Sequence, residues 1–380
     1  MQTAPVRKEL VLVGGGHAHV AVLKSFGMRP LPGVRLTLIA RDVATPYSGM
    51  LPGFVAGHYR FEECHIDLAP LARFAGARLI ADEAVGLDRA ARRLHCRRHL
   101  PLRYDVLSLD IGASPKPWTV PGAARHTIPV KPIDRFARRW ETLLDRLRAS
   151  RSPQDVVVVG GGAAGVELVL AMQHRTRGLL VRFALVTAEE LLPRHHASAR
   201  RRLMRILHER AIAVHTGAEV VEVADGELVC ADGRCIRFDA ALWATEAGAA
   251  PWLAETGLPL DRDGFVAVDA TLRSIGDPHV FAAGDVASVL PHPREKAGVF
   301  AVRQGPPLAA NLRRALSGQP LRPFVPQRRF LTLIGTGDRY AVAARGSWSL
   351  EGRWAWRLKQ WIDRRWMRQY QDLPAMPGGP

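Results

Sequence analysis

Three glycines in the middle of the chain have the spacing of a turn that binds the diphosphate of a dinucleotide. Gly160, Gly162 and Gly165 satisfy the pattern G-x-G-x-x-G, directly after the apolar run 155–159 and before a segment with helical spacing. The first glycine of such a turn permits the bend, the second lets the backbone approach a pyrophosphate, and the third lets the helix pack closely on the strand. The N–H groups at the start of the helix then face the phosphates. We therefore predict a dinucleotide site at this turn.

A second cluster of this kind lies near the amino terminus. Gly14 and Gly16 follow the apolar run 9–13, but His19 stands where the third glycine would be. A side chain at that position either moves the helix slightly away from the strand or points outward. His17 and His19 are two residues apart and do not share a helix face, so we expect local packing or a cofactor contact and no metal site.

A third motif ends an apolar run much later in the chain. Gly284 lets a ligand approach the end of the run 280–283, and the Asp285 carboxylate that follows is an acceptor suited to polyol hydroxyls. The segment 293–305 has the pattern of a helix whose amino-terminal end can face an electron-rich ring system. We predict that this motif binds a ligand together with the glycine turns.

The elements around these turns form the same unit twice. The order strand, glycine turn, helix, strand occupies 9–39 and recurs at 155–186, and a further strand is repeated at 104–112 and 238–245. We predict an α/β fold with two Rossmann-like dinucleotide-binding domains, the second inserted in the first, and a small C-terminal domain. The predicted borders place 1–117 and 248–319 in the first domain, 118–247 in the inserted domain, and 320–380 in the C-terminal domain.

Composition narrows the class of protein. The 380 residues are 47% hydrophobic and 23% charged, which is typical of globular proteins and excludes disordered, collagen-like and coiled-coil chains. The chain has no apolar run of membrane-spanning length and no signal-peptide pattern, and four scattered cysteines do not form a disulfide framework, so we expect a cytoplasmic protein. The net charge of +17 reflects either an anionic partner or composition alone, and no motif points to nucleic acid.

The order of the motifs resembles that of two-dinucleotide flavoproteins of the pyridine nucleotide oxidoreductase class, and within it the type II NADH dehydrogenase branch. The chain is similar more closely to the flavoprotein module found fused to the amino terminus of selenophosphate synthetase in some bacteria. The broader resemblance is carried by the motifs at 14–16, 104–112, 160–167, 243–245 and 280–287, and the closer one by the segments 14–19, 46–53, 56–59, 129–132 and 296–304.

This resemblance implies FAD in the first domain and NAD(P)H, as substrate, in the inserted one. By matching motifs, the first domain would contact FAD and the inserted domain would contact the nicotinamide nucleotide. The implied FAD contacts are Gly14, Gly16, His17, Ala18, Val85, Gly112, Gly284, Asp285, Ala297, Gly298 and Val299, and the implied nicotinamide nucleotide contacts are Gly160, Gly162, Ala163, Ala164, Gly165, Thr187 and Glu246.

The resemblance also suggests which side chains act in the reaction. Glu167 stands where this class keeps a glutamate near the junction of flavin and nicotinamide, and it would orient the nicotinamide or relay a proton. The alternative is a first-turn glutamate that is stabilised by the helix dipole. Lys296 would stabilise negative charge on the reduced flavin, and Tyr47 and Gln304 are assigned to the acceptor side of the ring.

Several positions depart from the pattern of the class. The acid that binds the adenosine ribose is replaced by Ala40 in the first unit and by Thr187 in the second, with Glu189 and Glu190 beyond it. The choice between NADH and NADPH therefore stays open. Glu246 stands where the class has glycine, and a carboxylate there adds repulsion beside two pyrophosphates unless it turns away.

The cysteines do not suggest thiol chemistry. Cys230 and Cys235 flank an Asp-Gly turn, which predicts a hairpin in which they face each other, inside the inserted domain and away from the flavin. Cys64 and Cys96 are expected to be ordinary small apolar residues.

The end of the chain predicts an amphipathic helix. On a helical wheel, Trp354, Trp361, Trp366 and Tyr370 lie on one side, and several arginines of 353–368 lie on the other. Such a helix suits a membrane surface, which would place the enzyme beside quinone on the inner face of the membrane. The alternative is a helix that packs on the protein's own body or on a dimer partner.

Three hypotheses follow. The first is hydride transfer from NAD(P)H to FAD, with electrons passing on to a quinone or another small acceptor. The second is reduction of a selenium or sulfur species, linked to selenophosphate synthetase. The third is a non-enzymatic flavin-binding redox sensor or partner subunit, in which Glu246 has weakened nucleotide binding.

Overall fold

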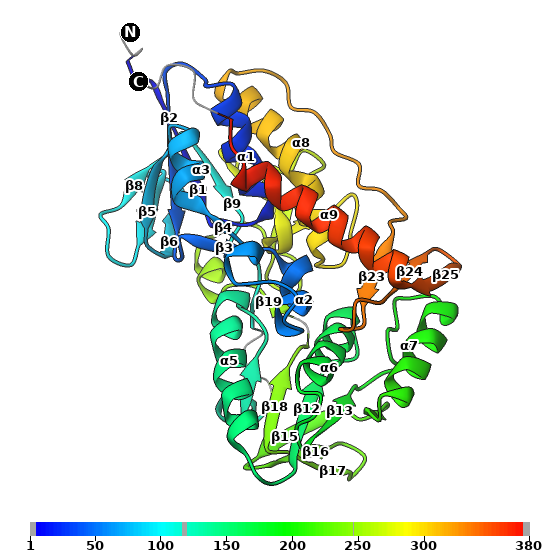
Figure 1. The fold of residues 1–380 in the computed structure, drawn as a ribbon. Helices are drawn as coiled ribbons and strands as arrows, with labels where there is room; N and C mark the ends of the chain where they lie inside the picture. Colours follow the sequence, from blue (N-terminus) through cyan, green and yellow to red (C-terminus); the bar gives the residue numbers. More distant parts are fainter. Residues whose placement is uncertain (1–4, 116–119, 246, 375–380) are drawn as a thin grey trace.

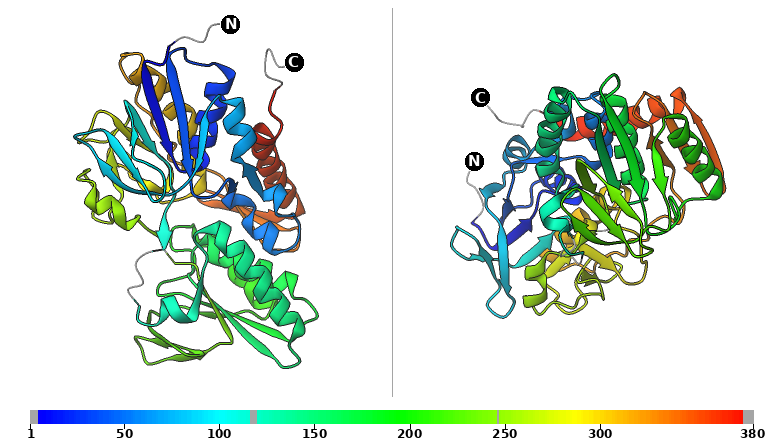
Figure 2. Two further views of the ribbon diagram at one scale, coloured as in Figure 1. Left: turned by 90° about the vertical axis from the view of Figure 1, so that its left-hand side faces the viewer. Right: turned by 90° about the horizontal axis from the view of Figure 1, so that it is seen from below.

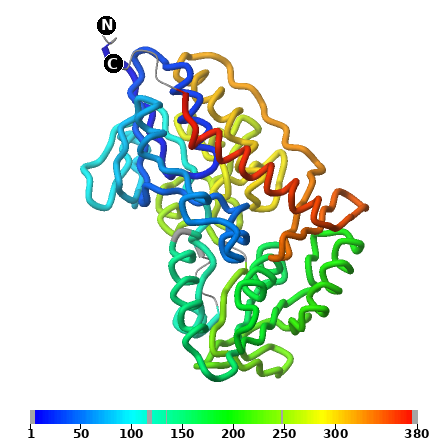
Figure 3. Tube along the Cα trace, in the orientation of Figure 1, coloured from blue at the N-terminus to red at the C-terminus, as the bar shows by residue number. Residues whose placement is uncertain are grey.

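The chain folds into two lobes, each built around a parallel sheet, with a smaller C-terminal part beside them (Figures 1 and 2). The structure is a computed structural model that describes residues 5–115, 120–245 and 247–374. The tube in Figure 3 follows the chain from the upper lobe into the green lower lobe and back again.

The sheet of the upper lobe has the order β21-β9-β1-β2-β5, and all its strands are parallel. Leu12 on the central strand pairs with Leu38 on one side and with Ser108 on the other. Leu12 and Leu38 have no exposed surface, as expected for a parallel sheet covered on both faces. The strands are β1 (Lys8–Val13), β2 (Val34–Ala40), β5 (Arg78–Ala81), β9 (Val106–Leu109) and β21 (Val280–Ala282).

Helices α1 (His17–Met28), α3 (Leu68–Phe74) and α8 (Gly298–Leu316) pack together in this lobe. Helix α1 runs beside α8, and α3 also contacts α1 (Figure 1). A Cβ on Gly305 would lie only 2.6 Å from that of Ala21, so glycine at this position permits the close approach of α1 and α8.

The lower lobe repeats the arrangement with the order β11-β18-β12-β13-β14, again parallel. The predicted α/β class with two Rossmann-like sheets is thus confirmed. Its strands are β11 (Thr127–Pro129), β12 (Gln154–Val159), β13 (Val181–Val186), β14 (Ala213–His215) and β18 (Ala240–Trp243), and its helices are α4 (Ala123–His126), α5 (Ile133–Ala149), α6 (Ala163–Arg175) and α7 (Ala197–Glu209).

Two short strands connect the lobes. β10 (Ser114–Pro115) leaves the upper lobe and β19 (Ala247–Gly248) returns to it, and the two pair antiparallel. Of the domain borders that we propose from the sequence, the one between 117 and 118 lies outside the described residues, and the one between 247 and 248 falls within β19.

Short sheets and turns complete the two lobes. A three-stranded sheet combines β6 (Ala84–Asp88), β7 (Arg93–Cys96) and β8 (Leu102–Arg103), and another combines β15 (Val220–Ala224), β16 (Glu227–Cys230) and β17 (Cys235–Arg237). The remaining elements of the lobes are β3 (Ala44–Pro46), β4 (His65–Asp67), β20 (Val266–Val268), β22 (Ala287–Val289) and α2 (Leu51–Val55), with the 3₁₀ turns η1 (Ser48–Met50), η2 (Glu62–Cys64), η3 (Pro251–Glu255) and η4 (Gly284–Val286).

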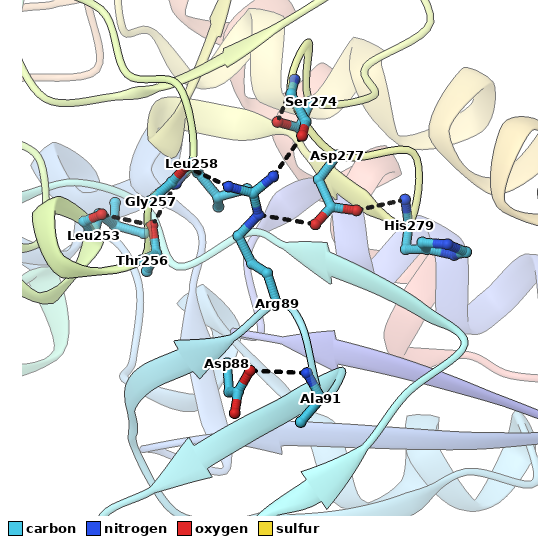
Figure 4. A network of polar contacts seen from close by, with 11 residues as sticks. Asp88, Arg89, Ala91, Leu253, Thr256, Gly257, Leu258, Ser274, Asp277 and His279 are labelled. Carbon is cyan, nitrogen blue, oxygen red and sulfur yellow. Dashed lines mark hydrogen bonds and ion pairs between the residues drawn. The ribbon is translucent and has the colours of Figure 1, made fainter.

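The β6–β7 hairpin is held to the second half of the upper lobe by one arginine. Arg89 donates from Nε to the Asp277 carboxylate at 3.0 Å, and its other two nitrogens reach the carbonyl groups of Gly257 and Gly276 (Figure 4). All three guanidinium nitrogens therefore bind segments that are far from the hairpin in sequence.

The cysteine hairpin differs from the sequence prediction. Cys235 pairs with Val229 and Cys230 pairs with Val220, so the two cysteines do not face each other. Cys230 is buried, Cys235 is exposed, and both thiols are free. The prediction was wrong because the turn is longer than a two-residue Asp-Gly turn, which shifts the register.

The C-terminal part consists of a sheet and one long helix. The strands of this sheet are β23 (Thr332–Gly335), β24 (Ala341–Arg345) and β25 (Trp348–Gly352). β24 and β25 contact α7, and β23 contacts α6. The helix α9 (Arg353–Gln371) lies along the upper lobe (Figure 2, red). Trp366 and Tyr370 are buried against the core of that lobe, whereas Trp361 is 59% exposed. The predicted single aromatic face is therefore wrong, because packing against the lobe divides the aromatic residues between two faces.

Candidate functional site

The first glycine turn, between β1 and α1, packs closely against Asp110. Gly14 has a φ of +92°, and a Cβ there would lie 2.3 Å from the Asp110 carbonyl oxygen. A Cβ on Gly16 would lie 2.3 Å from the carboxylate of the same aspartate. Both positions therefore require glycine, whereas Gly112, at the end of the neighbouring strand, faces open space.

His19 has a packing role. Its Nδ1 lies 2.7 Å from the Gly14 carbonyl oxygen, and its Nε2 lies 2.8 Å from the Ser108 hydroxyl. Burial lowers the pKa of His19 to about 4, so the ring is neutral. The ring therefore points inward and joins the turn to β9, and the outward orientation is wrong.

Asp110 is a site residue that the sequence analysis missed. Its Oδ2 accepts hydrogen bonds from the N–H groups of Ala18 and His19, at 2.8 Å and 2.9 Å. Burial is the main reason that the pKa of Asp110 is raised to about 7. The signal available in the sequence was an aspartate at the end of a mostly apolar strand segment, 106–111.

His17 has a buried ring nitrogen without a partner. No described residue hydrogen-bonds its Nε2. The ring lies 5.4 Å from those of Tyr47 and Trp366, which stack on each other at 4.3 Å. Burial lowers the pKa of His17 to about 4. A buried ring nitrogen without a protein partner is free to hydrogen-bond a ligand.

The turn after β21 is held from two sides. The N–H of Gly284 donates to Gln304 Oε1 at 2.6 Å, and Gly284 has a φ of +69°. The Asp285 carboxylate accepts a hydrogen bond from Nζ of Lys131 at 2.9 Å, and Lys131 belongs to the lower lobe. Gln304, which the sequence assigns to the acceptor side of the ring, therefore supports the turn. Lys131 is a second site residue that the sequence pattern did not indicate.

A small cavity, partly open to solvent, adjoins this turn. Asp285, Lys296, Ala297 and Gln304 are among the residues that line it. Lys296 Nζ donates to the Ala287 carbonyl oxygen at 2.6 Å and lies 3.9 Å from the centre of the Phe265 ring, and burial lowers its pKa. The start of α8 is closely packed, because a Cβ on Gly298 would lie 2.8 Å from Ser48 Oγ.

The second glycine turn, between β12 and α6, matches the sequence prediction in its geometry. Gly160 has a φ of +131°, and a Cβ on Gly165 would lie 1.9 Å from the Gly160 carbonyl oxygen. A Cβ on Gly162, at the start of α6, would meet nothing within 4 Å. Two of the glycines are thus needed for the fold, and the third leaves room for a ligand.

The other predicted nucleotide contacts lie around this turn. Ala163 and Ala164 begin α6, and Thr187 is buried against Gly161. Glu189 is exposed. Glu246, which was predicted to disturb nucleotide binding, lies outside the described residues. Val85, a predicted FAD contact, is half-buried at a bulge in β6.

Glu167 belongs to a cluster that joins α6, β23 and α9. Its Oε1 accepts from the N–H of Gly335 at 2.7 Å. A Cβ on Gly335 would lie 3.4 Å from this oxygen and 4.0 Å from Lys359 Cε, so the two side chains flank the same glycine. Burial raises the pKa of Glu167, and the Lys359 ammonium opposes that shift.

Lys359 acts electrostatically on this glutamate and bonds to Asp363, which contacts Tyr47. Its Nζ donates to the Gly49 carbonyl oxygen at 2.7 Å and to Asp363 Oδ2 at 3.1 Å. Asp363 is only 4% exposed and accepts a hydrogen bond from the Tyr47 hydroxyl. Burial raises the pKa of both Asp363 and Tyr47, so the phenol stays protonated. Neither Lys359 nor Asp363 was singled out from the sequence.

The residues at the first turn fit a bound FAD. The glycine cradle, the unpartnered Nε2 of His17 and the cavity beside Asp285 lie around the amino end of α1 and the turn after β21. The dipole of α1 favours a diphosphate there.

Comparison with known proteins identifies the family. Residues 8–311 match the family model described as pyridine nucleotide-disulphide oxidoreductase. The chain belongs to this family. It is 27% identical over 298 residues to a NADH dehydrogenase-like protein of Mycobacterium tuberculosis, covering 74% of each chain. It is 24% identical over 262 residues to the type II NADH:quinone oxidoreductase of Haemophilus influenzae, covering 60% of this chain and 55% of that protein.

Solved structures share the fold. The sulfide:quinone oxidoreductase of Aquifex aeolicus aligns with a TM-score of 0.80 at 17% identity, over 98% of this chain and 93% of that one. NDH2 from Plasmodium falciparum in complex with NADH aligns with a TM-score of 0.80 at 15% identity, over 97% and 99%. The family and its relatives establish an NAD(P)H-dependent, FAD-binding oxidoreductase.

Proposed function

We propose that this flavoprotein accepts hydride from NAD(P)H and passes the electrons to a quinone. The quinone proposal is supported by the likeness to the type II NADH:quinone oxidoreductase of Haemophilus influenzae. The observation that carries it is the buried cluster of Glu167, Lys359, Asp363 and Tyr47. FAD, when bound, supplies the chemistry of accepting a hydride and releasing two electrons.

Cofactor binding is assigned to the two turns. Gly14, Gly16 and the start of α1 would hold the FAD diphosphate, with Asp285 and His17 beside it. Gly162 and the start of α6 would hold the diphosphate of the nicotinamide nucleotide. The ion pair of Lys131 and Asp285 would hold the two lobes together beside the site.

The buried cluster would supply protons. Two-electron reduction of a quinone to a quinol consumes two protons, and a hydride carries only one. The cluster holds two carboxyl groups and one ammonium, so Lys359 cannot fully compensate both acids. One carboxyl therefore holds a proton more readily than a solvated acid, and Glu167 is the better placed at the start of α6.

The test is anaerobic reduction followed by an acceptor panel. We expect NADH or NADPH to bleach the flavin, and a short-chain quinone to reoxidise it faster than selenium or sulfur compounds do. Glu167→Gln should slow quinone reduction more than it changes the KM for NAD(P)H. Reoxidation by selenium compounds without quinone activity would overturn the proposal in favour of a link to selenophosphate synthesis.

The cysteines supply little support for that second function. Cys64 adjoins Tyr47 through the backbone, since the Tyr47 N–H donates to the Cys64 carbonyl oxygen at 2.8 Å. Burial raises the pKa of the Cys64 thiol to about 12, so it is not a nucleophilic thiolate at neutral pH.

We also propose that the outer face of α9 contacts an anionic lipid surface. No helix within the described residues is long and apolar enough to cross a membrane. The outer face combines exposed Trp361 and Ile362 with a groove whose lining includes Arg357, Arg365 and Arg368. Aromatic and cationic side chains on one helix face suit a membrane interface.

Vesicle sedimentation tests this surface. We expect the protein to sediment with phosphatidylglycerol-containing vesicles and not with pure phosphatidylcholine. Replacing Arg357, Arg365 and Arg368 by alanine should weaken sedimentation about tenfold or more, at about 1 kcal/mol per arginine. The matched control replaces exposed Arg135, Arg138 and Arg139 of α5 and should change nothing. Equal loss in both triple variants would refute a specific surface.

A further inference from the structure

The Asp110 carboxylate occupies the amino end of α1, where the fold offers its N–H groups to a dinucleotide. It accepts from Ala18 N at 2.8 Å and from His19 N at 2.9 Å. It also contacts the turn before α1 and the turn after β21, because a Cβ on Gly16 would lie 2.3 Å from its Oδ1 and a Cβ on Gly284 would lie 2.4 Å from the same atom. A negative charge therefore lies inside the proposed FAD cradle.

The groups around Asp110 do not neutralise it. It is 2% exposed, and the charge that acts on it most is Asp285 of η4, which has the same sign. Lys131, which precedes α5, is paired with Asp285. On α1, His17 and His19 are neutral because burial lowers the pKa of each to about 4. α8 contributes the uncharged Gln304, and β9 contributes Ser108.

A diphosphate at this helix end brings two further negative charges close to the carboxylate. Inside a protein, like charges at short range repel each other strongly. Protonation of the carboxylate removes this repulsion. We propose that Asp110 takes up a proton when FAD binds, so that the affinity for FAD falls as the pH rises. This inference rests on the proposed position of the FAD diphosphate at α1.

The size of the effect follows from proton linkage. Burial, the largest cause, raises the pKa of Asp110 to about 7 in the protein without FAD. Below that pH the Asp110 carboxyl is already protonated, so the free energy of FAD binding includes no contribution from proton uptake. Above it, each pH unit weakens binding by up to about tenfold, as long as Asp110 stays protonated in the complex. We expect the Kd for FAD to rise about tenfold between about pH 6 and about pH 8.

Asp110→Asn is the decisive variant. An asparagine oxygen can still accept from Ala18 N and His19 N, but it carries no charge. FAD is removed from the purified protein, and FAD is titrated back by fluorescence quenching from about pH 6 to about pH 9. We expect the variant to show less than about twofold change over this range, and to bind FAD about tenfold more tightly than the wild type at about pH 8.

Asp82→Asn is the matched control. Asp82 is also buried and accepts backbone N–H groups, from Glu83, Arg98 and His99, but it lies at the β5–β6 connection and these bonds lower its pKa. The control should keep the wild-type slope. A flat wild-type profile, or an Asp110→Asn profile with the wild-type slope, would overturn the proposal.

A second measurement does not depend on any variant. Calorimetric titration of the wild type in two buffers with different ionisation enthalpies counts the protons bound with FAD. We expect uptake of close to one proton at about pH 8 and almost none at about pH 6. No uptake at either pH would contradict the proposal. Failure of NAD(P)H to bleach the flavin, with the proton uptake intact, would count against the proposed reaction and support the role of Asp110.

Discussion

Lys131 and Asp285 connect the two dinucleotide-binding lobes at the edge of the candidate flavin site. Lys131 Nζ lies 2.9 Å from Asp285 Oδ2, and the two residues are 154 positions apart in sequence. The lysine immediately precedes α5 of the lower lobe, and the aspartate belongs to η4 of the upper lobe. The only cation bonded to Asp285 among the described residues is therefore supplied by the other lobe.

Lys131→Met should weaken FAD binding without unfolding the protein. The pair is partly exposed, so its loss should lower the free energy of unfolding by less than about 1 kcal/mol. The Asp285 charge left beside the diphosphate should raise the Kd for FAD about three- to tenfold. FAD titration and urea unfolding measure the two quantities. Arg60→Ala, which removes an exposed ion pair with Glu63, is the control and should alter neither.

Lys359→Met should make stability strongly dependent on pH. Burial raises the pKa of Glu167 and Asp363 above their unfolded values, and loss of the ammonium raises both further. A carboxyl with a raised pKa in the folded state contributes stability at low pH that is lost as the pH rises through that pKa. The variant should resemble the wild type near about pH 5 and be less stable by about 3–5 kcal/mol at about pH 8.

Urea unfolding at the two pH values measures this effect. Adding Asp363→Asn to Lys359→Met should recover part of the loss at high pH, because it removes one of the two uncompensated charges. Lys24→Met on α1, near the Tyr370 ring of α9, is the control for removal of a lysine charge close to the same helix. Equal destabilisation of Lys359→Met at both pH values would contradict the electrostatic explanation.

Gly162→Ala and Gly165→Ala should separate nucleotide binding from folding. A Cβ on Gly162 would meet open space, so the free energy of unfolding should change by less than about 1 kcal/mol. The methyl group would stand where a diphosphate approaches α6, and the Kd for NAD(P)H should rise at least about tenfold. Gly165→Ala should destabilise the protein instead, because its Cβ would lie 1.9 Å from the Gly160 carbonyl oxygen.

Binding of NAD(P)H to the FAD-loaded protein, followed by flavin fluorescence, and thermal unfolding distinguish the two variants. If Gly162→Ala binds NAD(P)H as the wild type does, the turn before α6 is not the nucleotide site.

Arg89→Ala should loosen the β6–β7 hairpin. The guanidinium binds Asp277 and two carbonyl groups, and Asp277 is buried (Figure 4). Loss of these contacts should cost about 2–3 kcal/mol in the free energy of unfolding. Arg89→Lys should recover less than half of it, because one ammonium cannot replace the planar set of donors. Arg97→Ala, at the exposed pair with Glu83, should cost less than about 0.5 kcal/mol in the same denaturant experiment.

The sequence by itself determined the parts of this protein that depend on local pattern. A buried strand, a glycine turn and a helix follow one another at Leu12 to Val20 and again at Val158 to Val166, and the spacing of such neighbours decides their conformation. The repeated α/β unit and the positions of both turns could therefore be predicted, together with the packing requirement at Gly165.

Only the tertiary structure decided which charges enter the site. Asp110 reaches Ala18, Lys131 reaches Asp285, and Lys359 approaches Glu167, each from a distant part of the chain. Residues far apart in sequence meet according to how sheets and helices pack, and no local spacing records that. The helical pattern of α9 is also local, but the face that it buries is determined by its packing against the upper lobe.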